Sequence, residues 1–238
     1  MELSRRGPLL IAEAVYLNHR GPFRMVIDTG SASSSVPRAV AQRIGLRPSY
    51  AVEQVTPAGT NLVAASLLDE VKAGPVTRRA MEVLILDSNI HAYDGILGQN
   101  WLAQSDYLLD YCHRRLVVDP DPPAGGVRLT LHYAEGRPAV AARVGGRPTD
   151  LVLDSGAETL VLFGSAPTTS IATILTANGP VAVRTSKVNV EFAQDGVRTM
   201  QAVFVSGSGR AGLLPLAGFS AVYVSHRNGV VVLMSQNP

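Results

Sequence analysis

The sequence has little cysteine, little charge and no long apolar run, and each shortage excludes a class of protein. Cys112 stands alone among 238 residues, so no disulfide can form within the chain and cysteines cannot build a zinc cluster. No apolar run approaches the roughly 18 residues that a membrane-spanning helix needs. The 21 Lys and Arg residues nearly balance the 19 Asp and Glu residues. The basic residues never merge into a run, which argues against a nucleic-acid partner.

The first residues of the chain do not resemble a targeting segment. Residues 1–8 are polar and basic, and residues 9–12 are too short for the apolar region of a signal peptide. We therefore expect no signal peptide and no membrane span. The compartment is then the cytoplasm, or the periplasm if a targeting segment has been removed.

What the sequence does contain is ample apolar material arranged in short stretches. Apolar residues make up 46% of the chain and charged residues 17%, which predicts a packed core rather than disorder. Runs rich in Val, Leu and Ile, separated by Gly, Pro and Asn, predict strands. The exceptions are a helix over residues 37–44, which starts at a proline and ends at Gly45, and a single turn around residues 99–104. The sequence therefore predicts an all-β protein.

The two halves of the chain resemble one another. Residues 14–30 and 139–156 each contain a strand, a turn with glycine, a second strand and then Asp-Thr/Ser-Gly. The aspartates of these motifs, Asp28 and Asp154, are 126 positions apart, about half the chain. Repetition at such a period predicts an internal duplication into two similar lobes.

A second similarity and a linker complete this organisation. Residues 94–98 (Asp-Gly-Ile-Leu-Gly) and 211–215 (Ala-Gly-Leu-Leu-Pro) follow the two aspartates, and a hairpin ends each half. Residues 119–126 contain three prolines and two glycines, a composition typical of a linker. We expect a first lobe over residues 1–120, this linker, and a second lobe over residues 127–238.

The two aspartates carry the candidate chemistry. Each follows an apolar strand, where an acid is costly unless it is hydrogen-bonded or paired. The glycine two residues later lets the backbone turn sharply beside the carboxylate. If the two copies meet face to face, two carboxylates share one site and hold one proton, because two like charges about 3 Å apart cannot both ionise.

These motifs resemble the retropepsin and pepsin group of aspartic proteases. The resemblance rests on residues 28–31 (Asp-Thr-Gly-Ser), residues 154–157 (Asp-Ser-Gly-Ala) and residues 94–98. Each half is retropepsin-sized, so the chain is similar to a fused retropepsin dimer. The resemblance implies two pseudo-twofold-related β-barrel lobes with an active-site cleft between them, the acid protease fold.

The resemblance also implies an activity and a set of residues. It implies an aspartic endopeptidase that hydrolyses peptide bonds with a water activated by Asp28 and Asp154, needs no cofactor or metal, works as a monomer and binds a polypeptide in extended conformation. The residues implied to support the dyad are Thr29, Gly30, Ser31, Ser155, Gly156 and Ala157. Those implied to brace it are Ile96, Leu97, Gly98, Leu213 and Leu214, and those implied to form flaps over the substrate are Thr56, Ala58, Gly59, Asn178 and Gly179.

The second half departs from this pattern in two places. Pro215 stands where the repeat predicts a glycine opposite Gly98, and proline has no N–H. A catalytically inactive peptide-binding module on the same fold is therefore the alternative function, and a processing protease that needs a partner outside this chain is a third. Ala157 also stands opposite Ser31, whose hydroxyl we expect to favour the ionised form of Asp28.

Other residues favour plainer interpretations. The five histidines show no metal-ligand spacing, and residues 207–212 match G-x-G-x-x-G without the βαβ context of a dinucleotide site. We expect Cys112 to be a small core residue and Trp101 to fill the core behind residues 96–98.

Overall fold

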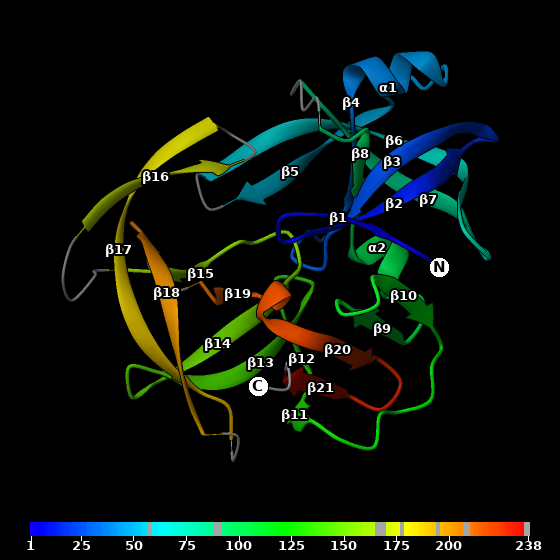
Figure 1. Cartoon of the computed structure of the whole chain (residues 1–238). Coiled ribbons are helices and arrows are strands. Elements are labelled where there is room, and N and C mark those ends of the chain that lie inside the picture. Colours follow the sequence, from blue (N-terminus) through cyan, green and yellow to red (C-terminus); the bar gives the residue numbers. More distant parts are fainter. Residues whose placement is uncertain are drawn as a thin grey trace.

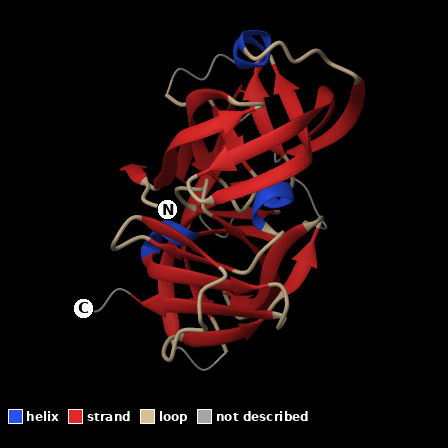
Figure 2. Cartoon of the chain, turned by 90° about the vertical axis from the view of Figure 1, so that its right-hand side faces the viewer, coloured by secondary structure: helices blue, strands red, loops and turns tan. Residues whose placement is uncertain are grey.

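The chain folds almost entirely into β-strands, arranged as two lobes (Figures 1 and 2). The computed structural model describes residues 1–56, 59–87, 92–164, 170–176, 179–193, 196–206 and 210–235. Its helical segments are short: α1 (Arg38–Arg43), α2 (Gln99–Leu102) and the 3-10 turn η1 (Leu216–Gly218). None of the described helices has the length and apolar character to cross a membrane. The expected all-β, two-lobed architecture is confirmed, whereas the barrel shape of each lobe stays a prediction.

An eight-stranded sheet forms the first lobe. Its order is β1 (Ser4–Arg6), β2 (Leu9–Leu17), β3 (Arg20–Ile27), β8 (Gly95–Leu97), β4 (Ser34–Pro37), β7 (Val76–Leu86), β6 (Gly59–Ala73) and β5 (Tyr50–Thr56). Strands β3 and β8 are parallel, as are β4 and β7, whereas β1–β2, β2–β3, β5–β6 and β6–β7 form antiparallel hairpins. Strand β8 thus lies between β3 and β4, both of which are distant from it in sequence.

A second eight-stranded sheet repeats this order strand for strand. It runs β12 (His132–Ala134), β13 (Arg137–Val144), β14 (Arg147–Asp154), β19 (Gly212–Pro215), β15 (Leu160–Phe163), β18 (Val197–Val205), β17 (Gly179–Glu191) and β16 (Ser170–Thr176). The additional pairing of β13 with β17 matches that of β2 with β6. Residues at equal register in the two sheets are called counterparts below.

A third sheet joins the two halves. Its order is β10 (Arg115–Val118), β9 (Tyr107–Asp110), β20 (Phe219–Ser225), β21 (Val230–Ser235) and β11 (Val127–Thr130). Strands β9 and β20, one from each half, pair antiparallel at its centre. Residues 119–126 connect β10 to β11 without forming a helix or a strand. The division into two domains around this linker stays a prediction.

Two-residue turns set the hairpins that lead to the two aspartates. Gly145 and Gly146 join β13 to β14 with φ of 55° and 79°, and Asn18 and His19 join β2 to β3 with φ of 48° and 61°. A tight hairpin turn of this kind needs positive φ at both central residues. The sequence pattern suggested a glycine in both turns, but the turn in the first half has none. The nearby Gly21 lies within β3.

One hydrophobic cluster runs through both lobes and the shared sheet. Trp101 lies in it with 1% of its surface exposed, as expected from the sequence. The helix expected over residues 37–44 is also confirmed, with Pro37 at its start and Gly45 at φ 73° just past its end. The expectation for Cys112 is wrong. This cysteine is exposed, because it lies in the turn between β9 and β10 rather than in the apolar strand before it.

Candidate active site

Asp28 and Asp154 lie at the ends of two counterpart strands that are buried on both faces. The last three residues of β3 and the last four of β14 are all buried, a pattern typical of the central strands of a sheet. Each strand has a parallel neighbour, β8 or β19. The Asp28 N–H donates to the Leu97 carbonyl at 3.0 Å. Both acids are therefore held on rigid, buried strands.

Four hydrogen bonds join the residues that follow the two aspartates. The Thr29 hydroxyl donates to the Leu153 carbonyl at 2.6 Å, and the Ser155 hydroxyl donates to the Ile27 carbonyl at 2.7 Å. Each hydroxyl also accepts from the other residue's N–H, at 2.9 Å and 3.0 Å. Thr29 and Ser155 are buried, so these bonds are sheltered from water and lock the two loops together.

The glycines of the two motifs let the carboxyl groups approach. A β-carbon at Gly30 would lie 2.5 Å and 2.6 Å from the two Asp154 carboxylate oxygens, and one at Gly156 would lie 2.9 Å from Asp28 Oδ2. No side chain fits at either position. Each aspartate therefore packs against the glycine of the opposite loop, and the two carboxyl groups are close enough to influence each other's pKa.

Burial and mutual repulsion change the protonation of this pair. Burial, followed by the charge of Asp154, raises the pKa of Asp28 to about 7. Burial also raises the pKa of Asp154, but its carboxylate accepts from the N–H groups of Gly156 at 2.8 Å and Ala157 at 3.0 Å, which oppose that rise. The Asp28 carboxylate accepts from the Gly30 N–H at 2.9 Å. The two groups titrate as a pair.

The expected role of the Ser31 hydroxyl is wrong. This hydroxyl donates to the Ser33 carbonyl at 2.8 Å and not to Asp28. Ala157, which has no hydroxyl, stabilises the Asp154 carboxylate through its backbone N–H instead. The Ser31 backbone N–H, rather than the hydroxyl, favours the ionised form of Asp28, so backbone donors act on both aspartates whatever the side chains at these two positions.

The two bracing segments lie beside the aspartate loops. Strand β8, which contains Ile96 and Leu97, pairs parallel with β3, and Gly98 directly follows it. A β-carbon at Gly98 would lie 2.6 Å from the Ser33 carbonyl oxygen. Leu213 and Leu214 pair in the same way with β14, ending at Asp154 opposite Pro215.

The structure shows how Pro215 fits. In the first half the Gly98 N–H donates to the Ser34 hydroxyl at 3.1 Å. The counterpart of Ser34 is Leu160, the first residue of β15. Donor and acceptor are thus both replaced by apolar residues in the second half, a double change that leaves no buried group unpaired.

The flap residues are described in part. Thr56 pairs with Gly59 at the end of the hairpin β5–β6, and Thr176 pairs with Gly179 at the end of the counterpart hairpin β16–β17. Ala58 and Asn178 lie outside the described residues. The role of these hairpins in covering a substrate stays a prediction.

The sequence interpretation missed two polar side chains beside the aspartate loops. The Gln99 side-chain amide, buried at the start of α2, donates to the Thr29 carbonyl at 2.9 Å. Arg137, at the start of β13, donates to the Gly30 carbonyl at 3.4 Å. Gln99 directly follows the first bracing segment, which is a signal that could have identified it. The position of Arg137 depends on the contact between lobes and leaves no such signal. Among the described residues, no group of three or more His, Cys, Asp or Glu side chains could hold a metal ion.

Parts of this chain are similar to known proteins. Residues 14–104 match the family of gag-polyprotein putative aspartyl proteases, a stretch that contains Asp28 and the first bracing segment. A solved structure of a retropepsin-like aspartic protease from Rickettsia conorii is 17% identical, covers 44% of this chain and 77% of that chain, and has a TM-score of 0.35. No curated protein matches the chain. The family match confirms the resemblance to retropepsin-like aspartic proteases.

Proposed function

We propose that this chain, which is similar to the retropepsin-like aspartic proteases, is an endopeptidase whose catalytic dyad is Asp28 and Asp154. The observation that carries the proposal is the set of four reciprocal hydrogen bonds between Thr29 and Ser155 and the opposite strands. These bonds hold two buried carboxyl groups of raised pKa in one site. A dyad that shares one proton at working pH is what this chemistry requires.

We propose different roles for the two carboxyls. Asp154, the better stabilised anion, takes a proton from a water molecule, and the water oxygen attacks the peptide carbonyl carbon. Asp28 gives its proton to the carbonyl oxygen as the bond forms. When the intermediate collapses, Asp154 passes its proton to the departing nitrogen and Asp28 recovers one from the hydroxyl group. The two carboxyls thus return to their starting protonation states, with Asp154 ionised and Asp28 protonated, and no covalent intermediate forms.

The equal strand orders of the two lobes support an internal duplication, in which each half supplies one aspartate. A single chain then contains the whole dyad, so we propose a monomer that binds an extended polypeptide between the flap hairpins and the dyad. Main-chain hydrogen bonds of a strand-like substrate would supply most of the recognition.

The test is hydrolysis of a peptide library from pH 3 to pH 8 by the wild type, Asp28→Asn and Asp154→Asn. Loss of one member of an acid–base pair lowers kcat/KM by about 10²–10⁴-fold. Asp69→Asn, which changes an exposed aspartate on β6, is the matched control and should leave the activity unchanged. A kcat/KM that stays at the wild-type value after either dyad substitution rules out the proposal.

The inactive peptide-binding module remains the second candidate, and Pro215 is the observation that favours it, since it removes one N–H from the second brace. The same experiment separates the two functions. Peptides that bind the wild type without being cleaved at any pH would favour the binding module.

A further inference from the structure

The second lobe places a cation beside the dyad. Arg137 begins β13, and its side chain is 14% exposed. Its guanidinium forms an ion pair with Glu135 in the preceding turn and donates to the Gly30 carbonyl of the first lobe at 3.4 Å. The N–H of the same glycine donates to Asp28, so Gly30 is held from both sides.

The first lobe has no such cation at the counterpart position. Arg137 is opposite Ala134 in β12 and β13, and Leu9 is opposite Arg6 in β1 and β2. Leu9 is therefore the counterpart of Arg137. Two strands that are otherwise counterparts therefore present an arginine on one side of the dyad and a leucine on the other.

Resting on the proposed function, we propose that Arg137 is a positioning residue of the dyad, which holds the Gly30 loop against the second lobe and sets the pH range in which the pair carries one proton. Its positive charge opposes the rise in the pKa of both aspartates. A nearby opposite charge favours the ionised form of a carboxyl group. Arg137 thus acts on the pair without touching the reacting atoms.

The other titratable and charged groups around the dyad come from several elements: Glu135 in the turn before β13, Tyr93 before β8, Tyr111 after β9 and Arg5 in β1. Burial raises the pKa of Tyr93 and of Tyr111, so both remain neutral where the dyad titrates. Arg5 lies 5.9 Å from the centre of the Tyr111 ring. Glu135 partly neutralises Arg137, and this fixes the guanidinium in place while moderating its effect on the dyad.

The experiment measures kcat/KM against pH for the wild type, Arg137→Leu and Arg137→Lys, using the full chain. Arg137→Leu installs the residue found at the counterpart position, and it should move both limbs of the pH profile upward by about one pH unit. The acid limb moves because the ionised carboxyl becomes easier to protonate, and the basic limb because the remaining proton is held more tightly. Arg137→Lys keeps the charge and should move both limbs less.

Arg143→Leu is the matched control, since Arg143 lies on the same strand, is exposed and donates to the Gly146 carbonyl. It should leave both limbs in place. A general loss of stability would lower activity at every pH without moving the limbs. Limbs of Arg137→Leu that coincide with those of the wild type overturn the inference and leave the proposed function intact.

A second measurement is independent of activity. The carboxyl carbons of the aspartates, labelled with ¹³C, are titrated by NMR in the wild type and in Arg137→Leu. A dyad titration that moves upward supports the inference even if no peptide is cleaved, an outcome that would count against the proposed function alone. A dyad titration that stays in place overturns the inference.

Discussion

The two lobes have the same strand order but treat their aspartates differently. Asp154 lies in the lobe that supplies Arg137, whereas the counterpart of Arg137 in the lobe of Asp28 is Leu9. The first lobe instead has a polar side chain directly after its brace: Gln99 donates to the Thr29 carbonyl. The comparison teaches that the backbone can be symmetric while the electrostatics are not. A pair of carboxyls that must hold one proton needs such a difference to decide which of them is ionised.

The largest effect should come from adding a methyl group at the glycines that touch the opposite aspartate. Gly30→Ala would push a β-carbon to 2.5 Å from a carboxylate oxygen of Asp154, against 2.9 Å from Asp28 for Gly156→Ala. A displacement near 1 Å in an active site lowers rates by about 10²-fold. We expect kcat/KM to fall at least that far for Gly30→Ala and less far for Gly156→Ala.

The control for this pair is Gly125→Ala in the linker, where an added β-carbon meets nothing within 4 Å. It should be as active as the wild type. Equal activity of Gly30→Ala and Gly125→Ala would show that the loops are not as closely apposed as described.

The next largest effect concerns the bonds that lock the loops together. Thr29→Val and Ser155→Ala each remove a buried hydroxyl that donates one bond and accepts another. A buried group left unpaired costs about 1–3 kcal/mol, so each variant should lose about 2–4 kcal/mol in free energy of unfolding, measured by urea denaturation. Thr29→Ser keeps the hydroxyl and should lose far less. A Thr29→Val variant as stable as Thr29→Ser would show that the hydroxyl does not hold the loops.

How far the sequence predicts this molecule follows from the range of the interactions involved. The strands that end at Asp28 and Asp154, the helix α1 and the linker are local patterns of apolar residues, proline and glycine, and the sequence predicts all of them. The doubled Asp-Thr/Ser-Gly motif also predicts that the two acids meet, because a repeat folds twice in the same way. The distribution of charge around them could not be predicted, since it depends on contacts between residues more than 100 positions apart, such as Arg137 with Gly30.

The wrong expectations for Ser31 and Cys112 have local causes instead. The Ser31 hydroxyl donates to the Ser33 carbonyl, and a residue type does not reveal which of several acceptors it will choose. Cys112 follows four strand residues but lies past their end, and the end of a strand is less certain from sequence than its centre. Both errors concern positions one to three residues away from a feature that the sequence predicts well.

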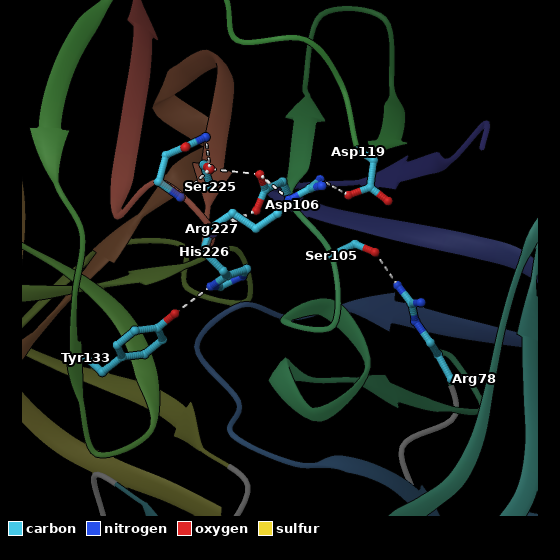
Figure 3. A network of polar contacts seen from close by, with 9 residues as sticks. Arg78, Ser105, Asp106, Asp119, Tyr133, Ser225, His226 and Arg227 are labelled. Carbon is cyan, nitrogen blue, oxygen red and sulfur yellow. Dashed lines mark hydrogen bonds and ion pairs between the residues drawn. The ribbon is translucent and has the colours of Figure 1, made fainter.

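A smaller, pH-dependent effect should distinguish two buried aspartates of the shared sheet. Asp106 of the first half accepts from the Ser225 hydroxyl at 2.8 Å, from the His226 N–H at 2.8 Å and from Arg227 (Figure 3). Burial opposes the ionised form, but these bonds lower the pKa of Asp106 below its ordinary value. Asp110 also has a lowered pKa, yet it binds His113 and Arg115 of its own hairpin. Of these two carboxylates, only that of Asp106 accepts hydrogen bonds from the other half of the chain.

Because the folded-state pKa of Asp106 is lowered, its contribution to stability is present above the unfolded pKa of about 3.9 and is lost as the pH falls through the folded value. Asp106→Asn should therefore lower the free energy of unfolding by about 2 kcal/mol at pH 7, with the difference from the wild type shrinking below pH 4. Asp110→Asn should cost less at pH 7. A deficit of Asp106→Asn that is constant from pH 7 to pH 3 would mean that its charge plays no part in joining the lobes.

The smallest effect is expected where the sequence suggested a large one. Ser31→Ala removes a hydroxyl that is bonded to the Ser33 carbonyl and not to Asp28, so the acid limb of the pH profile should stay within about 0.3 pH unit of the wild type, far less than the shift that an opposite charge produces. The reverse change, Ala157→Ser, adds a hydroxyl beside an Asp154 carboxylate that the Ala157 N–H already occupies at 3.0 Å, and it too should leave the limb in place. A shift of the acid limb to higher pH in Ser31→Ala would mean that the hydroxyl leaves Ser33 when substrate binds and stabilises Asp28. The side chains of residues 31 and 157 would then take part in the asymmetry between the two lobes, to which Arg137 also contributes.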